Sequence, residues 1–135
     1  MGYRPAEAGF VSLAPYRAYD SRYKDGKLGR GSRVVAIADR VKPPTGAVTA
    51  KDLVPASAVA IAYNLGVYAT ESSGYLAVTP PATKIVSASS LNWFDSDQSF
   101  SNGLVAQLDG TRTVKVFAGG RGSTHFVIDV LGYYI

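Results

Sequence analysis

The chain has 135 residues, of which 47% are hydrophobic and 18% are charged. This composition suits a single globular domain and argues against a disordered chain. The absence of cysteine excludes a disulfide framework and a thiolate zinc site. We expect no signal peptide, because the first residues lack a cationic region followed by an apolar one. We expect no membrane segment, because no apolar run approaches the roughly 20 residues that span a bilayer.

The net charge of +4 is unevenly distributed. Residues 17–51 carry nine basic side chains against Asp20, Asp25 and Asp39. Such a strip can face nucleic acid or an acidic protein surface. The basic residues are scattered among glycine and aspartate, however, and lack the interleaved aromatic residues of a single-strand binder. We therefore predict a solvated basic face and no specific nucleic-acid partner.

The first half of the chain predicts strands separated by irregular segments. Residues 1–8 are expected to form a flexible N-terminal arm, 41–46 a linker, and 50–57 one helical turn. Over 58–68, AVAIAYNLGVY, apolar side chains recur with a period of two, which indicates a strand in spite of the three alanines. Further strands are predicted at 10–14, 17–22 and 33–38.

The second half predicts a regular succession of strands at 74–80, 89–94, 102–109, 112–118 and 123–134. Asp109-Gly110 and the glycines of 119–122 are turn signals. We therefore expect residues 102–134 to form a three-stranded antiparallel meander. Turn signals recur about every ten residues, which favours an all-β fold. The prediction is a single-domain antiparallel β-sandwich over 1–135, of which a jelly roll is one form.

The last predicted strand holds the only histidine, His125, and an aspartate, Asp129, in an apolar run. Four residues apart on a strand, the two side chains share a face, and their Cα atoms lie about 13 Å apart. This separation excludes a shared metal ion and a direct histidine–carboxylate hydrogen bond. We predict instead that His125 forms a hydrogen bond across the sheet. Asp129 needs a cationic partner, and Arg17 or Arg22 would supply it and link the first strand to the last.

Three asparagines form a second polar set. Asn64, Asn92 and Asn102 lie in or beside apolar strands, where their amides could hold a bulge or a neighbouring loop. Alternatively, amides and exposed aromatic side chains could line a sugar-binding groove. We expect Trp93 in the core. The acidic loop at 95–97 lacks the ligand spacing of a calcium loop, and no recognised catalytic motif occurs. We predict no metal, no cofactor and no enzymatic activity.

A set of short motifs covers nearly the whole chain in a consistent order. The stretch FVSLAPYRAYDSR is similar to a consensus F-x-x-L-x-P-x-R-x-x-D-[ST]-R, and the glycine-rich turn GKLGRGS follows it. The other motifs lie at 54–67, 74–80, 89–94, 101–108 and 123–134. Together they resemble a β-sandwich module that is common in actinobacterial secreted and cell-surface proteins and also occurs in virion proteins of their phages. The resemblance implies that the following polar residues are structural anchors of the fold: Arg17, Asp20, Arg22, Asn64, Asn92, Asn102, His125 and Asp129.

The resemblance also implies a non-enzymatic function. Bacterial members usually carry a signal peptide and neighbouring domains, so a single module without them is more similar to a phage structural protein. We expect a virion protein assembled in the host cytoplasm, most specifically a decoration protein that binds the major capsid protein or another virion protein as a homo-oligomer. The alternatives are a tail component and a carbohydrate- or cell-wall-binding module that takes a surface glycan.

Overall fold

The computed structural model describes residues 9–86 and 88–135. The predicted N-terminal arm, residues 1–8, lies outside these ranges. Within them the chain forms ten β-strands: β1 Phe10–Asp20, β2 Gly31–Ala36, β3 Arg40–Lys42, β4 Ala47–Ala50, β5 Ala60–Tyr68, β6 Gly74–Thr79, β7 Leu91–Trp93, β8 Phe100–Gln107, β9 Thr113–Gly120 and β10 His125–Tyr134.

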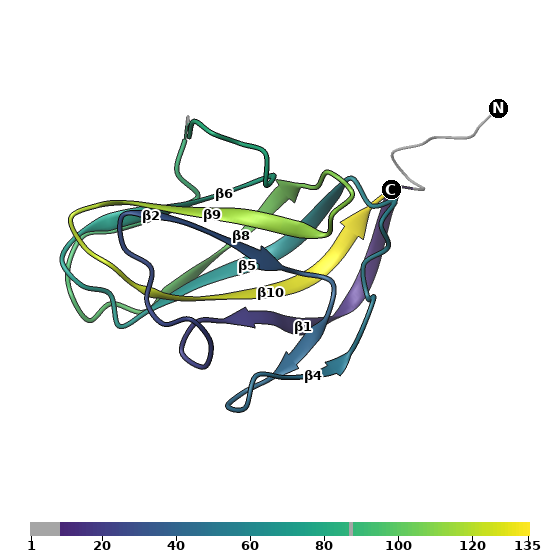
Figure 1. The fold of residues 1–135 in the computed structure, drawn as a ribbon, viewed down its shortest axis with the longest axis horizontal. Coiled ribbons are helices and arrows are strands. Elements are labelled where there is room, and N and C mark those ends of the chain that lie inside the picture. The colour runs from purple at the N-terminus through teal and green to yellow at the C-terminus, as the bar shows by residue number, and fades with distance from the viewer. Residues whose placement is uncertain (1–8, 87) are drawn as a thin grey trace.

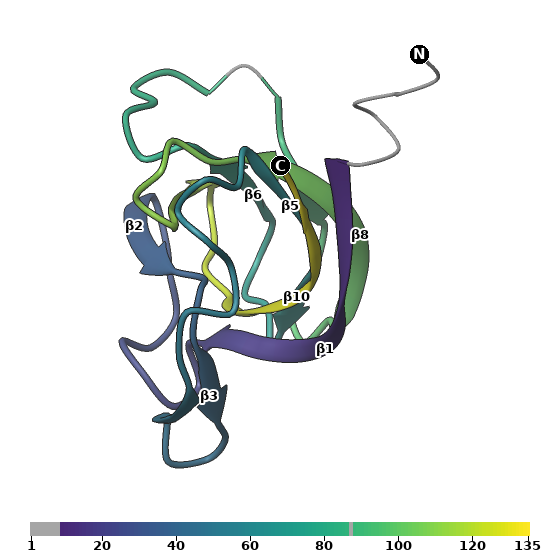
Figure 2. The ribbon, with the colours of Figure 1, turned by 90° about the vertical axis from the view of Figure 1, so that its right-hand side faces the viewer.

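Eight strands form two packed four-stranded antiparallel sheets (Figure 1). The first sheet has the order β1-β10-β5-β8 and the second the order β2-β9-β6-β7. The pairs are nested, β1 with β10, β2 with β9, β5 with β8 and β6 with β7, as in one long hairpin rolled into a sandwich. This arrangement is a jelly roll, and the predicted antiparallel β-sandwich is confirmed. The hairpin of β3 and β4 projects beyond β1 (Figure 2).

The core lies between the two sheets and takes alternate side chains from both. The first sheet contributes Tyr16, Ile61, Tyr63, Leu65, Val67, Phe126, Ile128 and Val130, and the second Val35, Leu76, Leu91, Trp93, Val114 and Val116. Trp93 is fully buried as predicted, and its Nε1 donates to the carbonyl oxygen of Glu71 at 3.1 Å. Each large apolar side chain buried here contributes about 1.5–3 kcal/mol to folding.

The predicted meander at 102–134 is wrong. Its segments form strands β8, β9 and β10, but β8 pairs with β5, β9 with β2 and β6, and β10 with β1 and β5. The connections at Asp109-Gly110 and after Gly120 therefore cross from one sheet to the other. A period of two identifies the buried face of a strand, but it is the same whether the next strand pairs with it or crosses over.

The N-terminal half also differs from the prediction. The two strands predicted at 10–14 and 17–22 form the single strand β1. The β1–β10 register shifts between Ser12 and Tyr16, and this irregularity accommodates Pro15 without ending the strand. Residues 50–57 form no helix: Ala50 ends β4, an irregular segment follows, and a single turn at 56–57 is closed by Ala58 N–H donating to the Pro55 carbonyl oxygen at 3.1 Å. The predicted linker at 41–46 belongs to a hairpin in which Val41 pairs with Val48.

Candidate functional site

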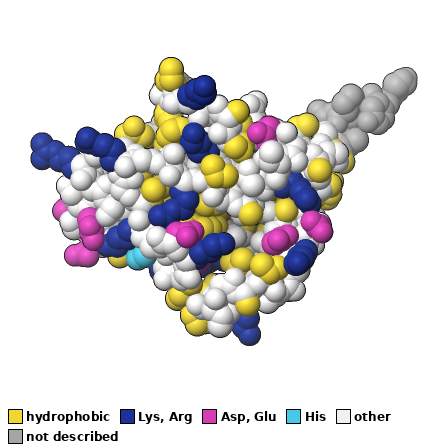
Figure 3. All heavy atoms as spheres, viewed as in Figure 1, with side chains coloured by type: hydrophobic (Ala, Val, Ile, Leu, Met, Phe, Trp, Pro, Cys, Tyr) yellow, Lys and Arg dark blue, Asp and Glu magenta, His cyan; other side chains and the backbone are white. Residues whose placement is uncertain are grey.

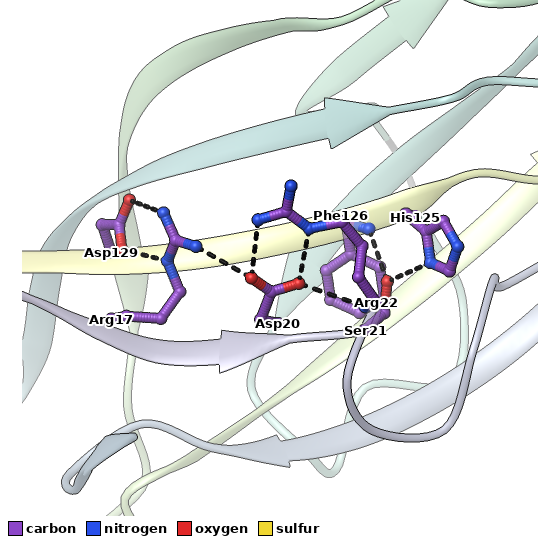
Figure 4. A network of polar contacts seen from close by, with 7 residues as sticks. All are labelled: Arg17, Asp20, Ser21, Arg22, His125, Phe126 and Asp129. Carbon is purple, nitrogen blue, oxygen red and sulfur yellow. Dashed lines mark hydrogen bonds and ion pairs between the residues drawn. The ribbon is translucent and has the colours of Figure 1, made fainter. Parts of the chain in front are cut away.

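The predicted partner of Asp129 is Arg17, which lies directly opposite it in the β1–β10 ladder. Arg17 Nε donates to Asp129 Oδ1 at 2.7 Å and Nη2 donates to Oδ2 at 3.2 Å (Figure 4). This bidentate ion pair lies on the outer face of the first sheet, where both side chains are half-buried. The predicted link between the first and last strands is confirmed, with Arg17 and not Arg22 as the partner.

Asp20 is the centre of the polar cluster. Its side chain is only 2% exposed and accepts hydrogen bonds from Arg17 Nη1 at 2.8 Å, Arg22 Nη2 at 2.8 Å and Arg22 Nε at 3.0 Å. Burial by itself raises the pKa of Asp20, but the hydrogen bonds from Arg22 and the two guanidinium charges outweigh it and hold the pKa below its usual value. Arg22 also lies over the Tyr68 ring, 4.6 Å from its centroid. Two arginines and two aspartates thus neutralise one another.

His125 makes the predicted hydrogen bond across the sheet. Its Nδ1 lies 3.0 Å from Oγ of Ser21, the residue that follows β1. Ser21 Oγ also accepts the backbone N–H of Phe126 at 2.8 Å, so the hydroxyl proton is available to a neutral imidazole. Burial, followed by the charge of Lys27, lowers the pKa of His125 and favours that neutral form. The contact fastens the end of β1 to the start of β10 (Figure 4).

A serine hydroxyl 3 Å from a histidine nitrogen is also the geometry of a nucleophile and its general base. A nucleophile must reach its substrate, however, and Ser21 is 0% exposed. None of the described hydrogen bonds joins His125 to a carboxylate that would orient the ring. His125 faces Tyr68 and Asp129 faces Asn64 in the β10–β5 ladder, so the two lie apart along the strand as predicted. The Ser21–His125 hydrogen bond therefore holds the end of β1 against the start of β10.

The three asparagines do not converge. Asn64 is opposite Asp129 on the outer face of the first sheet, Asn92 is exposed between buried Leu91 and Trp93 of the second sheet, and Asn102 is exposed on β8. Among the hydrogen bonds of the described residues, none involves one of these three side chains. The prediction that they hold a bulge or loop therefore gains no support from the contacts. Side-chain polarity alone does not reveal whether an amide finds a partner.

The basic stretch at 17–51 does not form one solvated face. Arg17 and Arg22 are bound to Asp20, and Arg33 donates to the Tyr19 hydroxyl at 2.9 Å and to the Gly26 carbonyl at 2.9 Å, which holds the loop after β1. The predicted solvated face is wrong for Arg17 and Arg33, which are only partly exposed, whereas Arg22 is exposed although it pairs with Asp20. On the face shown in Figure 3, basic side chains are spread among acidic ones.

A cleft of about 260 Å³ lies between the end of β1, β2 and the β3–β4 hairpin. Its lining combines apolar, aromatic and charged residues, among them Val34, Val41, Val48, Tyr19, Tyr23, Lys24, Asp25 and Asp39. Asp25 accepts from the Tyr19 hydroxyl at 3.1 Å, and Asp39 accepts from the backbone of Asp52 at 2.9 Å. This cleft was not predicted from the sequence, although Val41 and Val48, which flank the turn PPTG, are a hairpin signal.

Comparison with known proteins adds no relative, since no family model, curated protein or solved structure matches the chain. The resemblance to the actinobacterial and phage module stays a prediction from sequence motifs. Within 9–86 and 88–135, no group of three or more histidine, aspartate or glutamate residues could hold a metal ion. No helix in the described ranges is long and apolar enough to cross a membrane.

Proposed function

We propose that this protein is a non-enzymatic virion structural protein, most specifically a decoration protein on a phage capsid. The proposal is supported by the motif order over residues 10–134 and by the jelly-roll topology, an architecture that also serves in viral capsid domains. Fold alone does not establish function. The observation that carries the proposal is the use of Arg17, Asp20, Ser21, His125 and Asp129 in fastening β1 to β10, because these are the residues from which chemistry would otherwise be built.

Docking on an acidic capsid surface would use basic side chains that the fold does not engage. Lys24, Lys42 and Lys51 are exposed, and none of the described hydrogen bonds or ion pairs involves their side-chain amines. Lys42 and Lys51 lie at the ends of the β3–β4 hairpin, which projects from the sandwich (Figure 2). Charge complementarity of this kind steers association and makes it salt-dependent.

Mass spectrometry of purified particles tests the proposal. We expect the chain in virions at a copy number comparable to that of the major capsid protein, and its absence from particles would overturn the virion role. A copy number far below that of the capsid protein would favour a tail component. Labelling of Ser21 by a fluorophosphonate probe would contradict the non-enzymatic assignment.

The docking surface can be tested with capsids that lack the chain. The double variant Lys42→Glu and Lys51→Glu should reduce occupancy on such capsids and weaken its dependence on salt, because two cationic contacts are reversed. Lys84→Glu combined with Arg121→Glu, a double charge reversal at two other exposed positions, is the matched control and should bind as the wild type does. Equal binding by the hairpin variant and the control would exclude the hairpin as the docking element.

The cleft favours one second candidate, a carbohydrate-binding module. Tyr23 is 43% exposed at the cleft, and Asp25 and Asp39 offer carboxylates beside it, which is the combination of aromatic face and polar groups that sugars use. Binding on a glycan array that is lost in Tyr23→Ala would support this function. An array without binding would leave the virion role as the stronger proposal.

A further inference from the structure

Strand β8 forms an open edge of the first sheet. It pairs with β5 on one side, and no strand of the described ranges pairs with its other side. Ser101, Gly103, Val105 and Gln107 are all exposed along it. Val105 is 59% exposed, and a Cβ added at Gly103 would meet nothing within 4 Å. The outer face of β8 is therefore exposed to solvent, and no strand of the described ranges occupies its free edge.

The backbone groups that face this open side can be assigned from the hydrogen-bond pattern. Leu108 N–H donates to the Val59 carbonyl oxygen at 2.8 Å, in line with the β5–β8 ladder. In an antiparallel ladder, residues alternate between bonding to one neighbour and facing the other side. Residues 100, 102, 104 and 106 therefore bond to β5, and residues 101, 103, 105 and 107 direct their N–H and C=O groups outward.

The other sheet edges carry features that oppose pairing, and β8 carries none of them. β7 has three residues, β1 contains Pro15 and register shifts, and β2 contains Arg33. Natural edge strands are protected by short length, proline, bulges and charge. β8 has eight residues and no proline, its pairing with β5 shows no register shift, and residues 98–108 contain no charged side chain.

We propose that two copies of this chain dimerise through β8, which pairs with β8 of the second copy in antiparallel orientation with the two-fold axis at Leu104. The outward-facing residues then form hydrogen-bonded pairs, Gly103 with Val105 and Ser101 with Gln107 of the other copy. On the opposite face Leu104 meets its own symmetry mate and Phe100 meets Leu108. Each large residue thus faces a small or apolar one, and a shift of register by two would place Leu104 against Asn102.

The absence of charge in residues 98–108 favours a second copy as the partner. A net charge of +4 makes two copies repel each other in general, but this edge adds no like charges where the copies meet. An edge that pairs with itself must be self-complementary about its centre, and the pairing about Leu104 has that property. The two first sheets would join into one continuous eight-stranded sheet, twice the four strands of each copy.

Single cysteines test the position of the axis, because the chain has none of its own. Residues facing each other in a non-hydrogen-bonded pair have Cα atoms about 4.5 Å apart, within the range of a disulfide. Among Ser101→Cys, Gly103→Cys, Leu104→Cys and Val105→Cys, we expect oxidation to give the largest fraction of covalent dimer at position 104. A maximum at any other position would overturn the Leu104 axis, and equal low cross-linking at all four would overturn the dimer.

Analytical ultracentrifugation tests the interface without oxidation. The wild type should sediment as a concentration-dependent dimer, and Val105→Lys should weaken dimerisation at least about tenfold, since it places two like charges diagonally across the axis. Val34→Lys on β2 is the matched control at a valine that is 54% exposed, and it should dimerise as the wild type does. A wild type that stays monomeric up to about 0.5 mM, or a dimer that Val105→Lys leaves unchanged, would overturn the inference. Neither result bears on the copy number in virions, so the dimer and the virion role can fail separately.

Discussion

Replacing Asp20 by asparagine removes the carboxylate charge that pairs with both Arg17 and Arg22. Both Arg17 and Arg22 would keep their positive charge but lose a carboxylate that is almost completely buried. Removing one partner from a fully buried ion pair costs about 3–5 kcal/mol. The two arginine side chains are a quarter to a third exposed and can regain water, so the expected loss is smaller, about 2–3 kcal/mol. For a chain of this size that corresponds to a fall in Tm of about 8–12 °C.

Urea unfolding followed by Trp93 fluorescence measures this loss, because the only tryptophan is fully buried. Asp52→Asn is the control: Asp52 pairs with Arg112 at 2.8 Å, but its side chain is highly exposed, so the free energy of unfolding should change by no more than about 0.5 kcal/mol. If Asp20→Asn lost no more stability than Asp52→Asn, the assignment of Asp20 as the central anchor would be wrong.

Three further predictions concern pH and packing. The folded pKa of Asp20 lies below its unfolded value of about 4, so the stability that the Asp20 carboxylate contributes is complete above that pH and is lost as the pH falls through the folded pKa. Urea midpoints should therefore fall more steeply in acid for the wild type than for Asp20→Asn. Parallel curves would refute this. The folded pKa of His125 is also lowered, chiefly by burial and then by Lys27, so the neutral imidazole stabilises the fold, and the free energy of unfolding should decline as the pH falls below about 6.5. An NMR titration midpoint of His125 at or above that value would contradict the assignment. Lys27→Gln should raise the midpoint. Gly74→Ala should lower the free energy of unfolding by about 1–3 kcal/mol, because the added Cβ would overlap the Trp93 ring and lie 2.7 Å from the Gly119 carbonyl oxygen. The control Gly103→Ala places its Cβ in open space. Equal losses for the two variants in urea unfolding would show that the residues around Gly74 shift at little cost.

The predictions that succeeded follow from local requirements. A carboxylate between Ile128 and Val130 needs a cation, and an arginine one strand away is the partner best suited to it. The alternation of apolar side chains at 58–68 identified β5 and the buried face formed by Ile61, Tyr63 and Leu65, although Val59, just before the strand, is 55% exposed. The amides of Asn64, Asn92 and Asn102 carry no such requirement because they are at least partly exposed, and their surroundings depend on elements far away in the chain.

The sequence by itself therefore determined the strand segments of the sandwich, its fold class and the need of Asp129 for a basic partner, because periodicity and the cost of burying charge act over a few residues; it did not predict the β3–β4 hairpin. The tertiary structure decided which strands pair, since β8, β9 and β10 follow one another in the chain but alternate between the two sheets. It also decided that Asp20 is the most deeply buried of the charged residues in the cluster, and that β8 is left with an open edge. These features arise from contacts between residues far apart in the chain, such as Arg17 and Asp129, which are 112 positions apart, and a local pattern does not encode which distant strand will lie beside it.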